Sequence, residues 1–349
     1  MISEIADPRE AVATIFNAAV AASAIGSAWE LGLLDEVQSK KEVDLEEFCL
    51  RNDLDLPSMQ MLVTALEITD ILVRESGERS AVIPGRLLEE TIITKSLFHW
   101  LMIGSAGLFS RIPHVIRNAN RAGTFFTRDP IAISEACKDI NEQHFEKFFW
   151  QAMSGLDQQV SCVVDLGSGS GERLVQILEK HPAATGIGID ISLEAVQQAE
   201  FDTSNRGFGE RLSFVEGDAR DMHYQDEFAS VSLITSFMFG HDLWRRDSSD
   251  PRKNCIASLR KIREAFPNAQ RFLLGDTTRV LNCPESEFGV TGKSVPAFPL
   301  AFELGHDLMG ECRIPTMEEW IDVFPDAGWR LRKRHLVQSS YLSVIFELE

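Results

Sequence analysis

The sequence is poor in basic residues: its 34 Lys and Arg are outnumbered by 53 acidic residues, and the 349-residue chain has a formal net charge of −19. Such a chain would be repelled by nucleic acid and by anionic membranes, so we expect neither as a partner. The sequence also has no internal repeat, no low-complexity tract and no Walker phosphate-binding signature. Because 44% of its residues are hydrophobic and 25% are charged, its composition is that of a globular protein with one large domain or two ordinary ones.

The cysteines form no close pair. No two of the six lie within ten residues of each other: Cys49, Cys137, Cys162, Cys255, Cys283 and Cys312. This spacing excludes a CxxC zinc or redox motif. We therefore expect free, mostly buried thiols in a cytoplasmic protein.

A membrane span is not expected either. Residues 11–29 carry no charge, but small and polar residues interrupt them, and acidic residues precede them where a signal peptide would be basic. The segment therefore predicts a buried helix of a soluble protein.

Two domains of different character are predicted. Residues 1–150 have apolar residues at helical spacing in 8–29 and 53–69, followed by two short strand-like runs around Gly77 in 71–82. Two helices and a hairpin are typical of a winged helix. Because the chain is acidic, a dimerisation module is favoured over DNA binding, and we expect a homodimer.

Residues 151–349 instead alternate between strand-length apolar runs and helical stretches. The runs are 162–166, 185–189, 212–215, 231–237, 272–274 and 341–348. This alternation predicts an α/β domain with a doubly wound, Rossmann-like parallel sheet. A Gly-, Pro- and Ser-rich stretch at 284–299 predicts a long loop.

A glycine-rich turn follows the first predicted strand and opens a helix, where the backbone can turn tightly against a ligand. Asp190 ends the second strand, where a carboxylate can bind ribose hydroxyls, and Asp218 ends the third, where it can accept from an adenine amine. The full candidate cofactor set is Asp165, Gly167, Gly169, Gly171, Asp190, Asp218, Ala219 and Ser236.

The acid directly before the glycines, Asp165, suits the cationic amino-acid end of a cofactor better than a pyrophosphate, so an NAD(P) site is the weaker alternative. With these residues, 160–349 resembles the class I S-adenosylmethionine methyltransferases. Together with segment 315–349 and the helical N-terminal half, the whole chain resembles the dimeric O-methyltransferases. That resemblance implies an N-terminal domain that dimerises and contributes to the substrate pocket.

The tripeptide Gly-His-Asp occurs twice, at residues 240–242 and 305–307. His241 alone, after the fourth strand, would suit a general base, as in O-methyltransferases. Two such units at the rim of one sheet suggest a metal site built on His241 and His306, although residues so far apart in sequence need not meet.

A second resemblance favours the metal. Its segments are Phe98-His-Trp100, Thr127-Arg128-Asp129, Gly240-His241-Asp242 and Phe302-Glu-Leu-Gly-His306-Asp307. Together they are similar to the 2-oxo acid C3-methyltransferases, which include phenylpyruvate and 2-ketoarginine (5-guanidino-2-oxopentanoate) enzymes. The resemblance implies one metal ion, iron or zinc, on His241 and His306, with Arg128 binding the substrate. It implies 2-ketoarginine ahead of phenylpyruvate as the substrate, for biosynthesis of a β-methylated amino acid.

The expected chemistry runs through a metal-stabilised enolate. Carbon C3 of a 2-oxo acid is a poor nucleophile until it loses a proton, and a Lewis acid on the keto oxygen stabilises the enolate. Arg128 would anchor the carboxylate or enol oxygen. Asp242 would transfer the proton or orient a metal ligand, and Asp307 would either orient His306 or cap a loop.

Four residues are candidates for the wall of the substrate pocket, although plain core is an equal alternative for each: Phe98, Trp100, Met238 and Phe239. Three functions remain open at this point. A metal-assisted C-methyltransferase leads, followed by a metal-independent O-methyltransferase with His241 as base. The third is a non-enzymatic winged-helix regulator that retains a ligand pocket, and the net charge and the complete cofactor motif weigh against it.

Overall fold

The structure is a computed structural model that describes residues 7–75, 81–121, 129–156, 160–247, 250–291, 295, 297–337 and 343–349. The chain forms two compact units. The first comprises residues 1–110 and 128–139, and the second residues 111–127 and 140–349. The sequence suggests a single boundary near residue 150. In the structure the chain passes from the first unit to the second after residue 110, returns to the first for residues 128–139, and enters the second again at residue 140.

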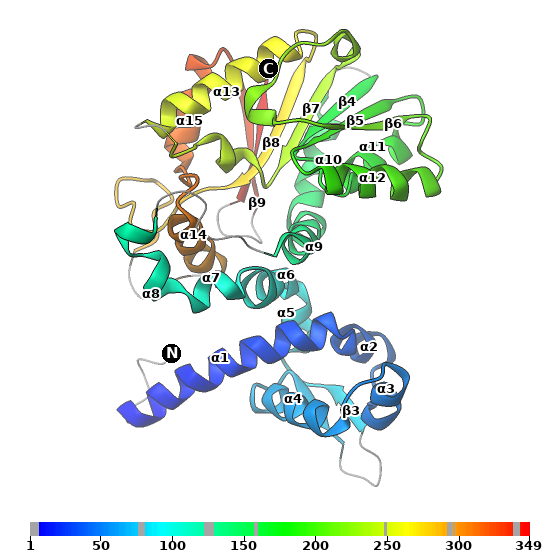
Figure 1. Ribbon diagram of the computed structural model, residues 1–349, viewed down its shortest axis with the longest axis vertical. Helices are drawn as coiled ribbons and strands as arrows, with labels where there is room; N and C mark the ends of the chain where they lie inside the picture. The colour runs from blue at the N-terminus through cyan, green and yellow to red at the C-terminus, as the bar shows by residue number, and fades with distance from the viewer. Residues whose placement is uncertain are drawn as a thin grey trace. The chain divides into compact units, whose positions relative to one another are not determined.

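The first unit is mainly helical (Figure 1). Its helices are α1 (Pro8–Glu30), α2 (Leu33–Lys40), α3 (Leu45–Arg51), α4 (Leu56–Ile68), α5 (Leu88–Ile93), α6 (Lys95–His99), the π-helical turn η2 (Trp100–Gly104), α7 (Ala106–Ser110) and most of α9 (Pro130–Ile140). A small sheet has the order β1 (Val43–Asp44), β3 (Ala81–Pro84), β2 (Leu72–Arg74). The antiparallel pair of β2 and β3 forms the hairpin predicted at 71–82, and Gly77 lies outside the described residues.

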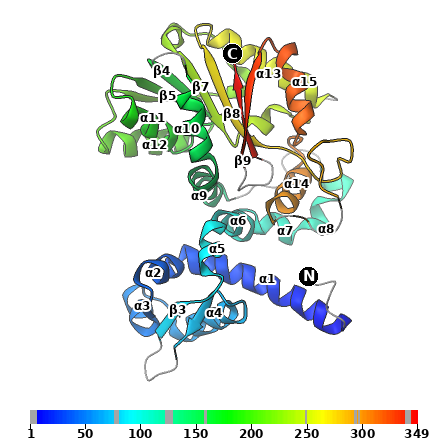
Figure 2. The same ribbon diagram turned by 180° about the vertical axis from the view of Figure 1, so that it is seen from behind.

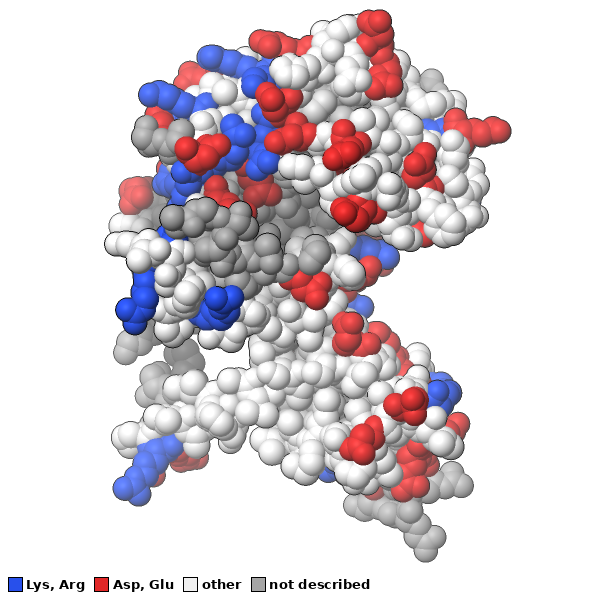
Figure 3. Space-filling view, viewed as in Figure 1, with Lys and Arg blue, Asp and Glu red and all other residues white. Residues whose placement is uncertain are grey.

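Helix α1 differs from the buried helix that the sequence predicts. Only its second half is buried, through residues such as Ala24 and Ala28, whereas Val12 is 64% and Phe16 70% exposed. Figure 3 shows its visible side almost free of charge. By length and composition alone α1 is able to cross a membrane, a test that the core helices of soluble proteins also pass. The apolar N-terminal half therefore has no cover within the described part of this chain.

The second unit is built on a seven-stranded sheet of order β6-β5-β4-β7-β8-β10-β9. Its strands are β4 (Cys162–Leu166), β5 (Thr185–Asp190), β6 (Leu212–Glu216), β7 (Leu233–Phe237), β8 (Arg271–Thr277), β9 (Leu331–Val337) and β10 (Ser343–Leu348). The first five in sheet order are parallel, and β10 runs antiparallel to both β8 and β9. This is the Rossmann-like α/β fold predicted from the sequence.

Helices cover both faces of this sheet, as Figures 1 and 2 show from opposite sides. On one face lie α13 (Pro251–Ala265) and α15 (Met317–Asp326); on the other lie α10 (Glu146–Ser154), α11 (Glu172–Lys180) and α12 (Leu193–Asn205). Buried residues of α13 and α15, including Leu259, Trp320 and Phe324, form one core with the strands. The remaining helices of this unit are α8 (Ile112–Val115) and α14 (Ala297–Met309).

Two elements of the second unit also differ from the sequence prediction. Strand β9 was not expected, because Arg332, Lys333 and Arg334 interrupt its apolar pattern. At the edge of a sheet such charges are tolerated, and they discourage pairing with another chain. The predicted loop at 284–299 ends earlier than expected, since α14 begins at Ala297 and carries His306.

Candidate active site

The glycine-rich turn between β4 and α11 has the backbone geometry that its glycines allow. Gly167 and Gly171 both have φ of +73°, a left-handed conformation that other residues adopt only at a cost. A Cβ on Gly171 would lie 2.5 Å from the Phe214 ring in the neighbouring strand region. The turn therefore needs glycine both for its conformation and for the close packing of α11 on the sheet.

Asp190, at the end of β5, holds this turn in place. One carboxylate oxygen accepts a hydrogen bond from Gly169 N at 2.9 Å, and the other accepts from Ser192 N at 3.0 Å. Because each carboxylate oxygen can accept two hydrogen bonds, ribose hydroxyls can still bind. Asp190 thus connects the two turns where the sequence predicts the cofactor.

Asp165 is buried in β4 and accepts a 2.6 Å hydrogen bond from Thr235 Oγ1 of β7. Burial raises the pKa of Asp165 to about 7, against the opposing effects of Thr235 and the positive charge of Arg173. A carboxyl group in this state gains its charge when a cation binds beside it. This property suits the ammonium group of an amino-acid cofactor.

Arg173, on α11, was not singled out from the sequence. Its guanidinium lies over the rings of Phe149 and Phe237, at 4.3 and 4.6 Å from their centroids, and burial lowers its pKa to about 10. A buried cation near Asp165 is well placed to balance a carboxylate, whether that of Asp165 or of an amino-acid ligand.

The remaining candidate cofactor residues have structural partners. Both carboxylate oxygens of Asp218 accept from Arg220, at 2.8 and 2.9 Å. Burial opposes the ionisation of Asp218, but Arg220 outweighs it and holds the pKa of Asp218 below its usual value. Ala219 is buried. Ser236 Oγ donates to the Leu166 carbonyl at 3.0 Å, so this hydroxyl ties β7 to β4.

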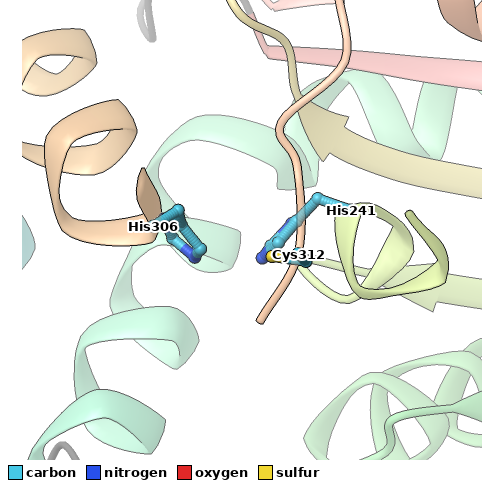
Figure 4. Close-up of side chains that lie close together, drawn as sticks. All are labelled: His241, His306 and Cys312. Carbon is cyan, nitrogen blue, oxygen red and sulfur yellow. The ribbon is translucent and has the colours of Figure 1, made fainter. Parts of the chain in front are cut away.

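The two predicted histidines meet in the structure. His241 lies in the 3-10 turn η7 (Gly240–Leu243), which follows β7, and His306 lies in the second half of α14. Their ring centroids are 4.8 Å apart with the planes at 85°, and both residues are buried. Figure 4 shows the rings turned toward each other from two separate elements.

Each histidine ring is held by its Nδ1 atom. Nδ1 of His241 lies 2.9 Å from Asp276 Oδ1, and Nδ1 of His306 lies 2.7 Å from the Phe302 carbonyl oxygen. An acceptor at Nδ1 favours the tautomer that has its proton there, which leaves Nε2 with a lone pair. Both rings are thus prepared to offer Nε2 as a metal ligand or as a base.

A cysteine joins this pair. His241, His306 and Cys312 are all buried, and one ligand atom from each lies within 4.8 Å of the other two. Figure 4 shows Cys312 beside the two rings. Imidazole and thiolate are preferred ligands of zinc and other borderline or soft metals. The donor set therefore fits a transition-metal ion.

The partners of the histidine rings at Nδ1 lie outside the two Gly-His-Asp units. The residue bonded to His241 is Asp276 rather than Asp242, which is half-buried. The suggestion that Asp307 orients His306 is wrong, because its carboxylate binds Arg246 at 2.9 Å and Arg279 at 2.8 Å. In α14, Asp307 follows His306 by one position and so points away from it.

The predicted pocket residues are distributed over both units. Met238 has a φ angle of +56°, which is unusual for a residue other than glycine. Phe239 covers Gly167, because a Cβ on that glycine would lie 3.1 Å from the Phe239 side chain. The segment before His241 therefore touches the glycine-rich turn. Trp100 is buried in η2 of the first unit. Arg128 lies outside the described residues.

Like Arg173, Asp276 and Cys312 were not predicted as site residues from the sequence. Asp276 follows a buried run in β8, and an acid at the carboxyl end of a parallel strand is a signal that was available. Cys312 has a weaker one. It follows His306 by six residues, a spacing that matches no short zinc motif. Only the three-dimensional structure shows that Cys312 lies close to the two histidines.

Comparison with known proteins agrees with this geometry. The family model described as "Methyltransferase domain" matches residues 159–283. "Methyltransferase ungE'" from Aspergillus campestris (strain IBT 28561) is 53% identical over 344 residues, covering 98% of each chain. The chain therefore belongs to the class I S-adenosylmethionine-dependent small-molecule methyltransferases.

Two further relatives are more distant. Indolepyruvate C-methyltransferase from Streptomyces griseus is 28% identical over 131 residues, which are 37% of each chain. The O-methyltransferase NcsB1 from neocarzinostatin biosynthesis, solved with S-adenosyl-L-homocysteine and 1,4-dihydroxy-2-naphthoic acid, has a TM-score of 0.60 at 18% identity, covering 94% of this chain and 95% of that one. At 18% identity this similarity supports the fold alone, and the aligned region includes residues of both units.

Proposed function

We propose that this methyltransferase transfers the methyl group of S-adenosylmethionine to C3 of a 2-oxo acid, at a metal centre that includes His241 and His306. The observation that carries the proposal is the meeting of two buried rings from separate elements, each held at Nδ1. A general base needs one such ring. A second ring, prepared in the same way beside the first, is what a metal site requires.

The residues fit a divalent ion electrostatically as well. Asp276 is fully buried, and its side chain is paired with the His241 ring, which is neutral when Nε2 carries a lone pair. A buried carboxylate is costly unless positive charge balances it. A bound metal would supply Lewis-acid polarisation of the keto oxygen, which makes the C3 hydrogen more acidic.

The protein's own residues supply the remaining parts. Asp165 and Arg173 face the amino-acid end of the cofactor and Asp190 its ribose, while Asp218 is the partner proposed for the adenine. Asp242 is proposed to accept the C3 proton. The electron pair left at C3 then forms a bond to the methyl carbon as the methyl–sulfur bond breaks, leaving S-adenosylhomocysteine.

An aromatic 2-oxo acid is the substrate class that we favour. The Phe302 ring centroid lies 4.2 Å from that of His306 and 5.4 Å from that of His241, and Phe298 packs on Phe302 at 4.8 Å. An aryl side chain would find offset and edge contacts there. The relative that acts on indolepyruvate supports the same class. Phenylpyruvate thus moves ahead of 2-ketoarginine, and the product would be the precursor of a β-methylated amino acid in secondary metabolism.

The test is methyl transfer to phenylpyruvate, indolepyruvate and 2-ketoarginine, each with and without a chelator. We expect the aromatic acids to react fastest and the chelator to abolish transfer until zinc or iron is added back. Methylation of 2-ketoarginine in preference to both aromatic acids would refute the substrate class. Undiminished transfer in the chelator would refute the metal.

O-methylation is the second candidate, and one observation favours it. The pair of His241 and Asp276 has the arrangement of a general base and its orienting carboxylate. Under this alternative, His241→Ala abolishes transfer to a phenolic acceptor, whereas His306→Ala has little effect. The metal proposal expects both substitutions to remove most of the activity toward 2-oxo acids.

A further inference from the structure

We infer that Cys312 is the third protein ligand of this centre, so that the chain binds its metal through two imidazoles and one thiolate. The inference rests on the proposed two-histidine metal site and adds a ligand to it. Cys312 has 3% exposure, and its Sγ lies within 4.8 Å of a ring nitrogen of both His241 and His306. These are donors from three separate segments of the second unit.

The backbone around Cys312 joins the segments of both histidines. Cys312 forms an antiparallel bridge with Arg245. On either side of it, Arg246 N donates to the Glu311 carbonyl and Arg313 N to the Trp244 carbonyl, each at 2.9 Å. The chain that leaves His241 is thereby paired with the chain that leaves His306. The bridge fixes Cys312 relative to both rings.

The end of α14 directs the chain back toward this bridge. Gly310 has φ of +73°, and its N–H donates to the His306 carbonyl at 2.9 Å. A glycine in the left-handed conformation just past a helix end reverses the chain within two residues. His306 lies in the last turn of α14, and the reversal after the helix brings Cys312 back to the same site.

The other side of the site is equally constrained. A Cβ on Gly240 would lie 2.7 Å from Asp276 Oδ2, and the His241 N–H donates to that oxygen. The Thr277 N–H donates to Oδ1 at 2.7 Å. Asp276 is thus held by backbone donors while it orients the ring of His241. A site whose ligands and supporting groups are all fixed resembles those built to hold a metal.

The donor set also indicates which metal is bound. Zinc takes imidazole nitrogen at about 2.0–2.1 Å and thiolate sulfur at about 2.3 Å, so its ligand atoms lie about 3.5 Å apart. The donor atoms here lie within 4.8 Å of one another, so they must approach by up to about 1.3 Å to share one ion. The charges of one thiolate and of Asp276 together balance a divalent cation. Three protein donors leave room for substrate oxygen, as in catalytic zinc sites, and thiolate favours zinc over the harder metals.

Cobalt(II) tests the ligand without any activity measurement, because a thiolate bound to it gives an intense charge-transfer band in the near ultraviolet. The metal-free full-length protein is titrated with cobalt(II) as wild type, Cys312→Ser and Cys283→Ser. Cys283 is the matched control, since it is also a buried cysteine in a connecting segment of the second unit. We expect one cobalt and the band in the wild type and in Cys283→Ser. Cys312→Ser should lose the band and bind at least about tenfold more weakly.

The outcomes separate this inference from the proposed function. One bound cobalt without the band in the wild type overturns the cysteine ligand and leaves the two-histidine centre standing. A band that persists in Cys312→Ser also overturns it. If the wild type binds no cobalt, both the cysteine ligand and the metal centre are refuted. The wild-type spectrum needs no substitution, so the test does not depend on the folding of a variant.

Discussion

Nδ1 of His241 and Oδ1 of Asp276 lie 2.9 Å apart, and both residues are buried. The contact joins the turn after β7 to the end of β8, two neighbouring parallel strands. It favours the tautomer with the proton on Nδ1 and the lone pair on Nε2. Either proposed chemistry at His241 needs this contact, so its removal is the first test of the site.

Asp276→Asn should lower metal affinity or turnover by about 10–100-fold, the usual effect of removing a carboxylate that orients a metal-bound histidine. The substituted amide keeps the size of the side chain but loses its charge. Metal content and kcat are measured together. Asp242→Asn serves as the comparison: it should retain full metal content, because Asp276 is the carboxylate bonded to Nδ1 of His241. Equal loss of metal in both variants would contradict the assignment.

The second prediction is that His306→Ala affects the metal centre and leaves the cofactor site intact. The variant should lose metal and most methyl transfer to 2-oxo acids, since Lewis-acid stabilisation is worth several kcal/mol. Its affinity for S-adenosylmethionine should remain near that of the wild type, because the proposed cofactor residues are Asp165, Asp190 and Asp218 and do not include His306. Added metal should not restore the variant. Activity near the wild-type level would rule out His306 as a ligand.

Sequence patterns predicted the sheet, and they pointed to most of the candidate site because strand ends carry the chemistry in this fold. Asp165, Asp190 and His241 all follow or end buried strands, and parallel strands end at the same edge. Asp276 obeys the same rule, but no motif drew attention to it. Cys312 does not follow a strand, and its position depends on the reversal at Gly310 and on a bridge that no local pattern encodes. The tertiary path of the chain therefore decides the third ligand.

The third prediction concerns Asp190. Asp190→Ala should weaken S-adenosylmethionine binding by about 1.5–3 kcal/mol, because hydrogen bonds to a charged acceptor are lost. The loss includes the contact with Gly169 N, which shapes the glycine-rich turn. Asp190→Asn keeps one oxygen acceptor and should bind with intermediate affinity. Calorimetry that gives the wild-type affinity for the Ala variant would remove Asp190 from the cofactor site.

The fourth prediction is a homodimer that covers α1. The N-terminal half of this helix exposes Val12, Ile15, Phe16 and Val20 at 49–70%, and contiguous exposed apolar residues on a helix commonly mark an interface. Light scattering at micromolar concentration should give twice the 39.1 kDa of one chain. Phe16→Glu should shift the protein toward the monomer, whereas Leu50→Glu should not, because Leu50 is an exposed residue of the separate helix α3. A monomeric wild type would refute this interface.

The last prediction follows from the raised pKa of Asp165, about 7 through burial. Between about pH 3.8 and pH 7, Asp165 keeps its proton in the folded chain and has lost it in the unfolded chain. The contribution of Asp165 to the free energy of unfolding therefore falls as the pH rises through this range. Asp165→Asn should remove that part of the slope.

The same proton links pH to cofactor binding. An ammonium group beside Asp165 favours its ionised form, so S-adenosylmethionine should release about one proton on binding near pH 6, and its affinity should rise with pH up to about 7. Calorimetry in two buffers of different ionisation enthalpy measures that proton. S-adenosylhomocysteine, which has the same amino-acid end but no sulfonium charge, should release it too. Asp165→Asn should bind both ligands more weakly and without the release. If only the sulfonium compound releases a proton, Asp165 faces the sulfur and not the amine, and its proposed role is wrong.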